Sequence, residues 1–175
     1  MSLIEPENRP APIRLLDALD RRTVLVAGTL ALLSGLAGCG TVRTTANGAG
    51  ASASAASLVA GIRRANGLGP LAPDTQLERA AFQQASYMAD ARRMVHTTGW
   101  GKDFSSRVKG NGIEGAAAEN IAEGRMDLAR LFDMWMNSLP HRRNLLDPRF
   151  TRFGLAYAGN GEKADWRYWA LVLGK

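Results

Sequence analysis

The sequence predicts an α+β domain built in layers, and three observations lead to that prediction. Apolar residues recur at helical spacing through the first half of the folded region. Two runs that we predict to be paired strands lie close together near the C-terminus. Helices come first and the paired strands late, without the alternation of strand and helix that builds a parallel sheet.

The helical part of the domain begins with two predicted helices. We expect Ser57 to cap the first helix, which ends at Asn66-Gly67. A turn with two prolines follows over residues 68–73, and Asp74 then caps a second, longer helix that ends near His96. The apolar stripe of this second helix contains Leu77, Ala81, Ala85 and Met88.

The remaining elements are shorter. Residues 104–109 are predicted as a short helix, 118–122 as a strand or an extended loop, 126–137 as a third helix, and 153–158 and 166–173 as the closing strands. Asn160-Gly161 marks the connection between these last two strands. Seven aromatic residues crowd this half of the chain, and we expect most of them in the core: Trp135, Phe150, Phe153, Tyr157, Trp166, Tyr168 and Trp169.

The composition is that of a globular protein with a basic surface. The chain has 175 residues, of which 46% are hydrophobic and 22% are charged, and its net charge is +6. A basic surface suits nucleic acid, anionic lipid or acidic glycan. The location of the protein must therefore decide among these partners.

The N-terminus carries the features of an export signal. Arg21-Arg22 precede an apolar run over residues 24–38, which is shorter than the roughly 20 residues that span a bilayer as a helix. The run ends in Leu36-Ala37-Gly38-Cys39 and resembles the bacterial lipobox, in which the cysteine is lipidated and becomes the mature N-terminus. We predict a signal peptide over residues 1–39 with Cys39 as the lipidation site. The alternative is a single buried structural cysteine.

Location and partners follow from this signal. The arginine pair resembles a twin-arginine export signal, and an ordinary positive n-region would look much the same. Gly40 stands where an aspartate would indicate inner-membrane retention, so the outer membrane is favoured. Residues 40–54 are predicted as a flexible tether and 55–175 as the folded domain. The lipid anchor makes the membrane a partner, and an envelope location argues against nucleic acid.

Two histidines and one glutamate are the candidates for chemistry. His96 follows the second helix, where a histidine also serves as a helix C-terminal residue. Glu119 lies among small apolar residues, so it either points outward or is held inside by donors. His141 lies on a turn that Ser138 can cap, with Pro140 in its early positions. Together they could form an open metal site, although their spacing alone favours structural roles.

Two longer motifs carry a family resemblance. The box Ala118-Glu119-Asn120-Ile121-Ala122 and the box HRxNLLxPxFT, which begins at His141, resemble the CAP superfamily of cysteine-rich secretory protein, antigen 5 and pathogenesis-related 1 domains. The likeness extends from Ala55 to Gly174 and is greatest to the short bacterial members. It implies a three-layer α-β-α sandwich around a central antiparallel sheet, with a cleft on one side.

The resemblance also implies a metal-binding cleft. In the family two histidines and two glutamates line it and can hold a divalent cation, often zinc. His96, Glu119 and His141 match three of these positions and are the predicted metal ligands. Ser138 stands where larger relatives place the second glutamate, and we expect it to line the cleft together with Asn120.

Three functions remain open. The first is a membrane-anchored, non-enzymatic CAP module that binds a lipid-like small ligand or a partner. The second is a metal-assisted hydrolase of the peptidase kind, in which Glu119 and His141 are catalytic and Ser138 is a conceivable nucleophile. The third is a structural domain whose cleft is a vestigial hydrogen-bond network.

Overall fold

The computed structural model describes residues 47–161, 163 and 165–175 of the chain. The predicted signal peptide, the lipidation site at Cys39 and the first residues of the tether lie outside the described residues. In the part that is described, no helix is long and apolar enough to cross a membrane.

Five helices and five strands make up the described chain. The helices are α2 (Ser52–Ala65), α3 (Thr75–Ala91), α4 (Phe104–Gly110), α5 (Leu128–Asn137) and α6 (Leu139–Leu145). The strands are β1 (Asn47–Gly50), β2 (Ala72–Pro73), β3 (Ala117–Gly124), β4 (Arg152–Gly159) and β5 (Arg167–Gly174).

The strands form one sheet in the order β1-β4-β5-β3. All three of these pairings are antiparallel, and the two-residue strand β2 adds a short parallel pairing to β4. Strand β3 pairs with β5 over its whole length, from Ala117 opposite Gly174 to Gly124 opposite Arg167. The central antiparallel sheet predicted from the family resemblance is thus confirmed.

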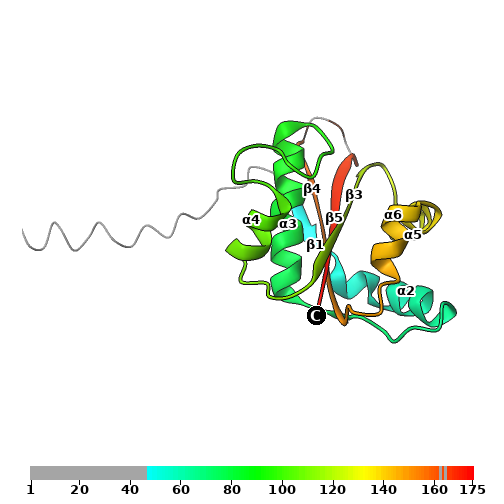
Figure 1. Cartoon of the computed structure of the whole chain (residues 1–175). Helices are drawn as coiled ribbons and strands as arrows, with labels where there is room; N and C mark the ends of the chain where they lie inside the picture. Colours follow the sequence, from blue (N-terminus) through cyan, green and yellow to red (C-terminus); the bar gives the residue numbers. More distant parts are fainter. Residues whose placement is uncertain (1–46, 162, 164) are drawn as a thin grey trace, which may run out of the picture. The chain divides into compact units, whose positions relative to one another are not determined.

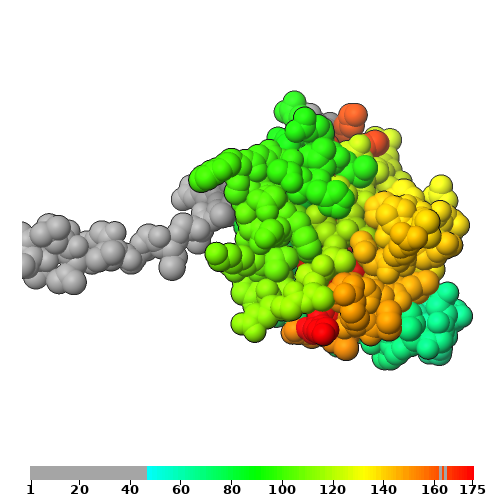
Figure 2. Space-filling view, viewed as in Figure 1, coloured from blue at the N-terminus to red at the C-terminus, as the bar shows by residue number. Residues whose placement is uncertain are grey.

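Helices cover both faces of the sheet. Figure 1 shows α3 and α4 on one side of it and α2, α5 and α6 on the other. Because successive side chains of a strand point to opposite faces, β5 contributes side chains to two cores. Leu171 packs with α5, whereas Val172 packs with α3. The two helical layers form opposite sides of the domain surface, green and yellow to orange in Figure 2. The predicted α-β-α sandwich is therefore confirmed.

The aromatic residues divide between these cores. Trp135, Phe153 and Trp169 are among the largest fully buried side chains, and Phe150 and Tyr168 are also buried. Tyr157 and Trp166 are only half-buried.

Ordered structure begins earlier than we predicted. Residues 47–50 form β1 and α2 begins at Ser52, so regular structure starts inside the predicted tether, and the helix starts five residues before Ser57. Ala51 at the N-cap provides no side-chain cap. Instead, the Ser52 amide donates to the carboxylate of Glu78, and the Ala51 amide donates to the Leu155 carbonyl. Partners distant in sequence thus satisfy the helix end.

Helix α3 lies directly against β4. Asp74 caps the helix as predicted, and its carboxylate accepts from the amides of Gln76 and Leu77. A Cβ atom at Gly154 would lie only 2.0 Å from the Glu78 nitrogen, so glycine is required for this close approach. The helix is thereby fixed on the sheet, and so is the start of the loop that follows it.

Candidate functional site

The candidate site is built around β3, the edge strand of the sheet. This strand is the last of the sheet, and two consecutive residues on it point to opposite layers. Glu119 points to α4 and the α3–α4 loop, and Asn120 points to α6. Asn144 and Trp135, from the α5–α6 layer, donate to the carbonyls of Glu119 and Ile121 and so cover the edge.

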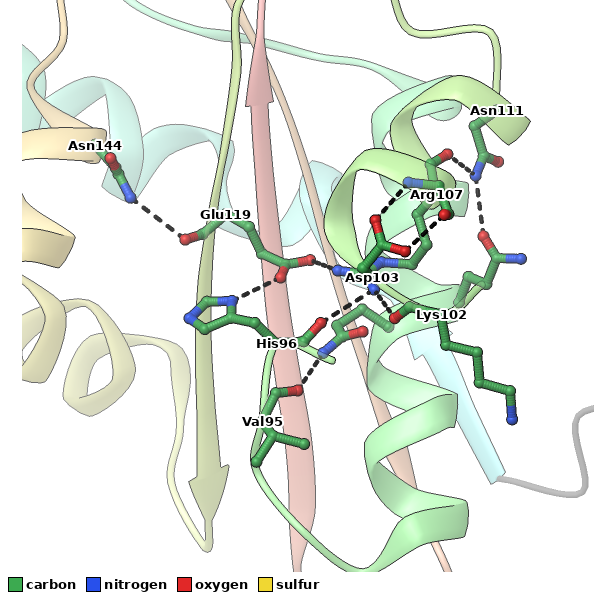
Figure 3. Close-up of polar contacts among 11 residues, drawn as sticks. Val95, His96, Lys102, Asp103, Arg107, Asn111, Glu119 and Asn144 are labelled. Atoms are coloured by element: carbon green, nitrogen blue, oxygen red, sulfur yellow. Dashed lines mark hydrogen bonds and ion pairs between the residues drawn. The ribbon is translucent and has the colours of Figure 1, made fainter. Parts of the chain in front are cut away.

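Glu119 is buried and doubly bonded. Its side chain is 2% exposed, and Figure 3 shows it between His96 and Arg107. Arg107 Nη2 donates to Oε2 at 2.5 Å, and His96 Nδ1 lies 2.8 Å from Oε1. A buried carboxylate needs such partners, because burial without them is costly. Of the two arrangements left open by the sequence, the structure shows the one in which donors hold Glu119 inside.

Arg107 links this carboxylate to the loop that carries His96. Its side chain is 1% exposed, and Nη1 donates to the carbonyls of Lys102 and His96 at 2.7 and 3.3 Å. One guanidinium therefore fixes the loop backbone and the carboxylate together. Sequence reasoning assigned Arg107 no role. The feature of the sequence that could have indicated its burial is its position three residues after Phe104, on the half-buried side of α4.

His141 lies on the opposite layer, in the first turn of α6. Its Nδ1 is 2.8 Å from the hydroxyl oxygen of Ser138, and its carbonyl accepts a hydrogen bond from Asn120 Nδ2 at 3.1 Å. Ser138 occupies the N-cap position and Pro140 lies in the first turn, as predicted. The Ser138 side chain does not cap the helix, however, because its hydroxyl contacts the imidazole instead.

The two histidines interact electrostatically. Burial lowers the pKa of His141 below its ordinary value, and the nearby imidazole of His96 lowers it further. His141 is therefore neutral at neutral pH, the form in which imidazole binds a metal. Within the described part of the chain, neither Nε2 atom has a hydrogen-bond partner. Each ring is thus held at Nδ1 and leaves Nε2 available.

These contacts bear on the predicted metal ligands. Both Glu119 oxygens are already engaged, so Glu119 orients His96 in the way that carboxylates hold metal-binding histidines. Ser138 does the same for His141 with a neutral hydroxyl. No group of three or more His, Cys, Asp or Glu residues that could hold a metal ion occurs among the described residues. His96 and His141 each leave one imidazole nitrogen available, and a cation held by both would take its remaining ligands from other donors.

Comparison with known proteins identifies the family. Residues 56–173 match the Cysteine-rich secretory protein family, CAP, so the chain belongs to this family. The uncharacterized protein YkwD of Bacillus subtilis is 36% identical over 101 residues, which are 57% of this chain and 39% of the relative.

Solved structures agree with this assignment. An outer surface protein from Borrelia burgdorferi superimposes with a TM-score of 0.65 at 21% identity, over 75% of this chain and 98% of that one. An extracellular, SCP-domain-containing protein of Bacillus anthracis gives a TM-score of 0.61 at 26% identity, over 70% of this chain and 39% of that one. The match spans well under half of the Bacillus relatives, and the similarity to the Borrelia protein shows the fold alone.

Proposed function

We propose that this chain is an exported CAP module of the bacterial cell envelope, anchored to the outer membrane through a lipid on Cys39. In this proposal it binds a lipid-like ligand or a partner without chemical turnover, and its cleft holds a divalent cation such as zinc. The observation that carries the proposal is the pair of imidazole rings of His96 and His141, each oriented at Nδ1 with Nε2 available. Export is supported by the extracellular protein of Bacillus anthracis, which is 26% identical and shares the fold.

The donor set fits a weakly held cation. His96 and His141 would supply the two protein ligands, and Glu119 and Ser138 would orient the rings. A bound cation would supply a positive charge that attracts the polar end of a ligand. Since no carboxylate replaces Ser138 next to His141, we expect a lower affinity for zinc than that of a site with three or four protein ligands.

Zinc titration of the purified chain tests the cleft. The chain contains only two histidines and one cysteine, so a histidine-dependent signal can come only from His96 and His141. We expect binding at pH 7 that the double replacement His96→Ala/His141→Ala abolishes. Glu114→Gln, which removes an exposed carboxylate, is the matched control and should bind as the wild type does. Zinc binding that the double variant retains would refute the proposed ligands.

The anchor and the ligand need separate tests. Metabolic labelling with a radioactive fatty acid should mark the wild-type chain and leave Cys39→Ser unlabelled, and an equal label in both would exclude Cys39. For the ligand, lipids extracted from the chain purified from its host should contain a species enriched over the membrane average. A lipid extract that matches the membrane, or contains nothing, would remove the lipid-like ligand from the proposal.

One contact favours hydrolysis as a second function. Ser138 and His141 lie within hydrogen-bonding distance, as a nucleophile and its base do. A base also needs an orienting group on its other nitrogen, and His141 Nε2 has none among the described residues. A fluorophosphonate probe that labels the wild type and not Ser138→Ala would establish this chemistry, and an unlabelled wild type would exclude it.

A further inference from the structure

Trp100 is the most exposed large hydrophobic residue among the described residues. Its relative exposure is 103%, so the whole indole faces solvent. It lies between Gly99 and Gly101, and the positive φ of 68° at Gly101 belongs to a turn that holds the tryptophan out from the domain. An indole buries 150–250 Å² when it is covered, so such full exposure favours a partner that covers it.

The rest of the α3–α4 loop, residues 92–103, has the composition of a membrane-surface segment. Met94 is 43% exposed, and the basic side chains of Arg92, Arg93 and Lys102 are exposed on the same loop. Tryptophan gathers at the boundary between lipid and water, and basic residues beside it are attracted to anionic headgroups. The exposed apolar residues Trp100 and Met94, on a loop with basic side chains, therefore fit an anionic bilayer better than a neutral protein surface.

The described chain enters the domain near the start of the α3–α4 loop. Asn47 and Trp166 line one small pocket, and Arg92 and Trp166 line the neighbouring one. The entry of the chain and the start of the α3–α4 loop thus share Trp166 as a neighbour. Strand β1 supports this placement, since it runs along α3: a Cβ atom at Gly50 would meet Glu78, and one at Gly48 would meet Phe82.

The length of chain before β1 limits how far this end can be from the membrane. Eight peptide steps separate Cys39 from Asn47. At full extension they span at most about 28 Å. That is close to the length of α3, which has 17 residues and extends for about 26 Å. A domain anchored at Cys39 therefore keeps Asn47, where the described chain enters the domain, within about one helix length of the lipid headgroups.

We propose that the α3–α4 loop docks into the surface of an anionic bilayer, with Trp100 at the level of the headgroups and Arg93 against lipid phosphates. The orientation that this gives rests on the proposed anchor at Cys39, whereas the docking itself depends on the loop alone. His96 lies four residues before Trp100 on the same loop. Docking would therefore place the His96 side of the site next to the lipids from which a lipid-like ligand comes.

An environment-sensitive dye on a single cysteine tests the docking. In the lipidated mature chain, which begins at Cys39, the only natural thiol is acylated, so Trp100→Cys offers one site for an NBD label. Leu139→Cys, on the exposed surface of α6, is the matched control. After reconstitution into vesicles of phosphatidylcholine and phosphatidylglycerol, we expect a blue shift and a gain in NBD fluorescence at position 100 and neither at position 139.

A second arm separates the docking from the anchor. The mature-length Cys39→Ser chain, residues 39–175 without the apolar run 24–38, is labelled in the same way and mixed with excess vesicles. A shift at position 100 then supports docking even if lipidation fails. With unlabelled Cys39→Ser chain in sedimentation, Arg93→Gln should weaken binding to the anionic vesicles about fivefold. Arg143→Gln, which removes an exposed arginine of α6, should leave it unchanged.

Three results would overturn the inference. One is an unchanged label at position 100 in both the lipidated and the Cys39→Ser chains. Another is an equal response at positions 100 and 139. The third is a response at position 100 that depends on protein concentration in the absence of vesicles, which would show that a second copy of the chain covers Trp100. If the lipidated chain floats with the vesicles while the first of these results is found, the docking is refuted and the anchor is left intact.

Discussion

The buried pair of Arg107 and Glu119 makes the candidate site sensitive to the loss of either charge. Both side chains are at most 2% exposed, so removing one partner leaves the other charge buried without compensation. We predict that Arg107→Met lowers the free energy of unfolding by about 3–5 kcal/mol, measured by urea denaturation. Arg107→Met/Glu119→Gln, which removes both charges, should recover more than half of that loss.

An exposed ion pair provides the control for this prediction. Arg130 and Asp133 form a pair within α5 with side chains 71% and 55% exposed. Arg130→Met should lower the free energy of unfolding by less than about 1 kcal/mol, because solvent screens such pairs. If Arg107→Met were no more destabilising than Arg130→Met, the buried pair would have no structural role.

Ser138 determines how strongly the second imidazole can hold a cation. Its hydroxyl orients His141 without adding negative charge. We predict that Ser138→Ala weakens zinc binding by about tenfold, the lower end of the effect of losing such an orienting partner. Ser138→Glu should strengthen zinc binding, because it adds a carboxylate beside the ring. Calorimetric titration at pH 7 measures both, with the exposed Ser105→Ala as control, and equal affinities in all three variants would contradict this role.

The site residues differ in how far sequence predicts them. Glu119 stands out because a carboxylate among small apolar residues demands donors, and the AENIA and HRxNLLxPxFT boxes lead to His96 and His141 by resemblance. Arg107 does not stand out, since nothing local distinguishes it from Lys109 on the same helix. Only the tertiary packing buries the one and leaves the other exposed.

At the scale of the elements, α3 depends on its cap. Burial acts to raise the pKa of Asp74, but hydrogen bonds from Leu77 and Gln76 and the ion pair with Arg152 outweigh it, so the pKa is lowered. A carboxylate with a lowered folded-state pKa stabilises the fold above its unfolded-state pKa, and that stability is lost as the pH falls through the folded-state pKa.

A mutation at Asp74 tests this dependence. Asp74→Ala should lower the free energy of unfolding by about 1–2 kcal/mol at pH 7. The difference from the wild type should shrink as the pH falls below about 4, near the unfolded-state pKa of aspartate. Asp74→Asn keeps an acceptor without the charge and should lose less at pH 7. Thermal melts at several pH values provide the comparison, and a difference that is the same at pH 3 and pH 7 would exclude the ionised cap.

Local and non-local partners explain which elements the sequence predicts. Helix α3 has its cap two residues from the first amide it binds, so pattern reasoning finds its start. Pattern reasoning does not find the start of α2, because the amides at that end donate to Glu78 and Leu155, which lie far along the chain. Strand β1 has no apolar alternation at all: its sequence is NGAG, and only its pairing with β4 makes it a strand.

At the scale of the whole molecule, adjacent residues of β3 hold the two helical layers at the candidate site. Glu119 binds the α4 layer through Arg107, and Asn120 binds the α6 layer through Asn144 and the His141 carbonyl. The candidate site exists because this edge strand is shared. Each histidine belongs to a different layer, so their relative position depends on both attachments.

This division predicts that the two layers can be loosened separately. Asn120→Ala removes the side-chain hydrogen bonds to α6 and leaves the Glu119 contacts in place. Amide hydrogen exchange should then speed up in residues 139–145 and stay unchanged in residues 96–107, because local opening follows local contacts. Arg107→Met should have the converse effect. If either variant accelerated exchange equally in both segments, the layers would open as one unit, and the two histidines would be held by the fold as a whole rather than by neighbouring residues of one strand.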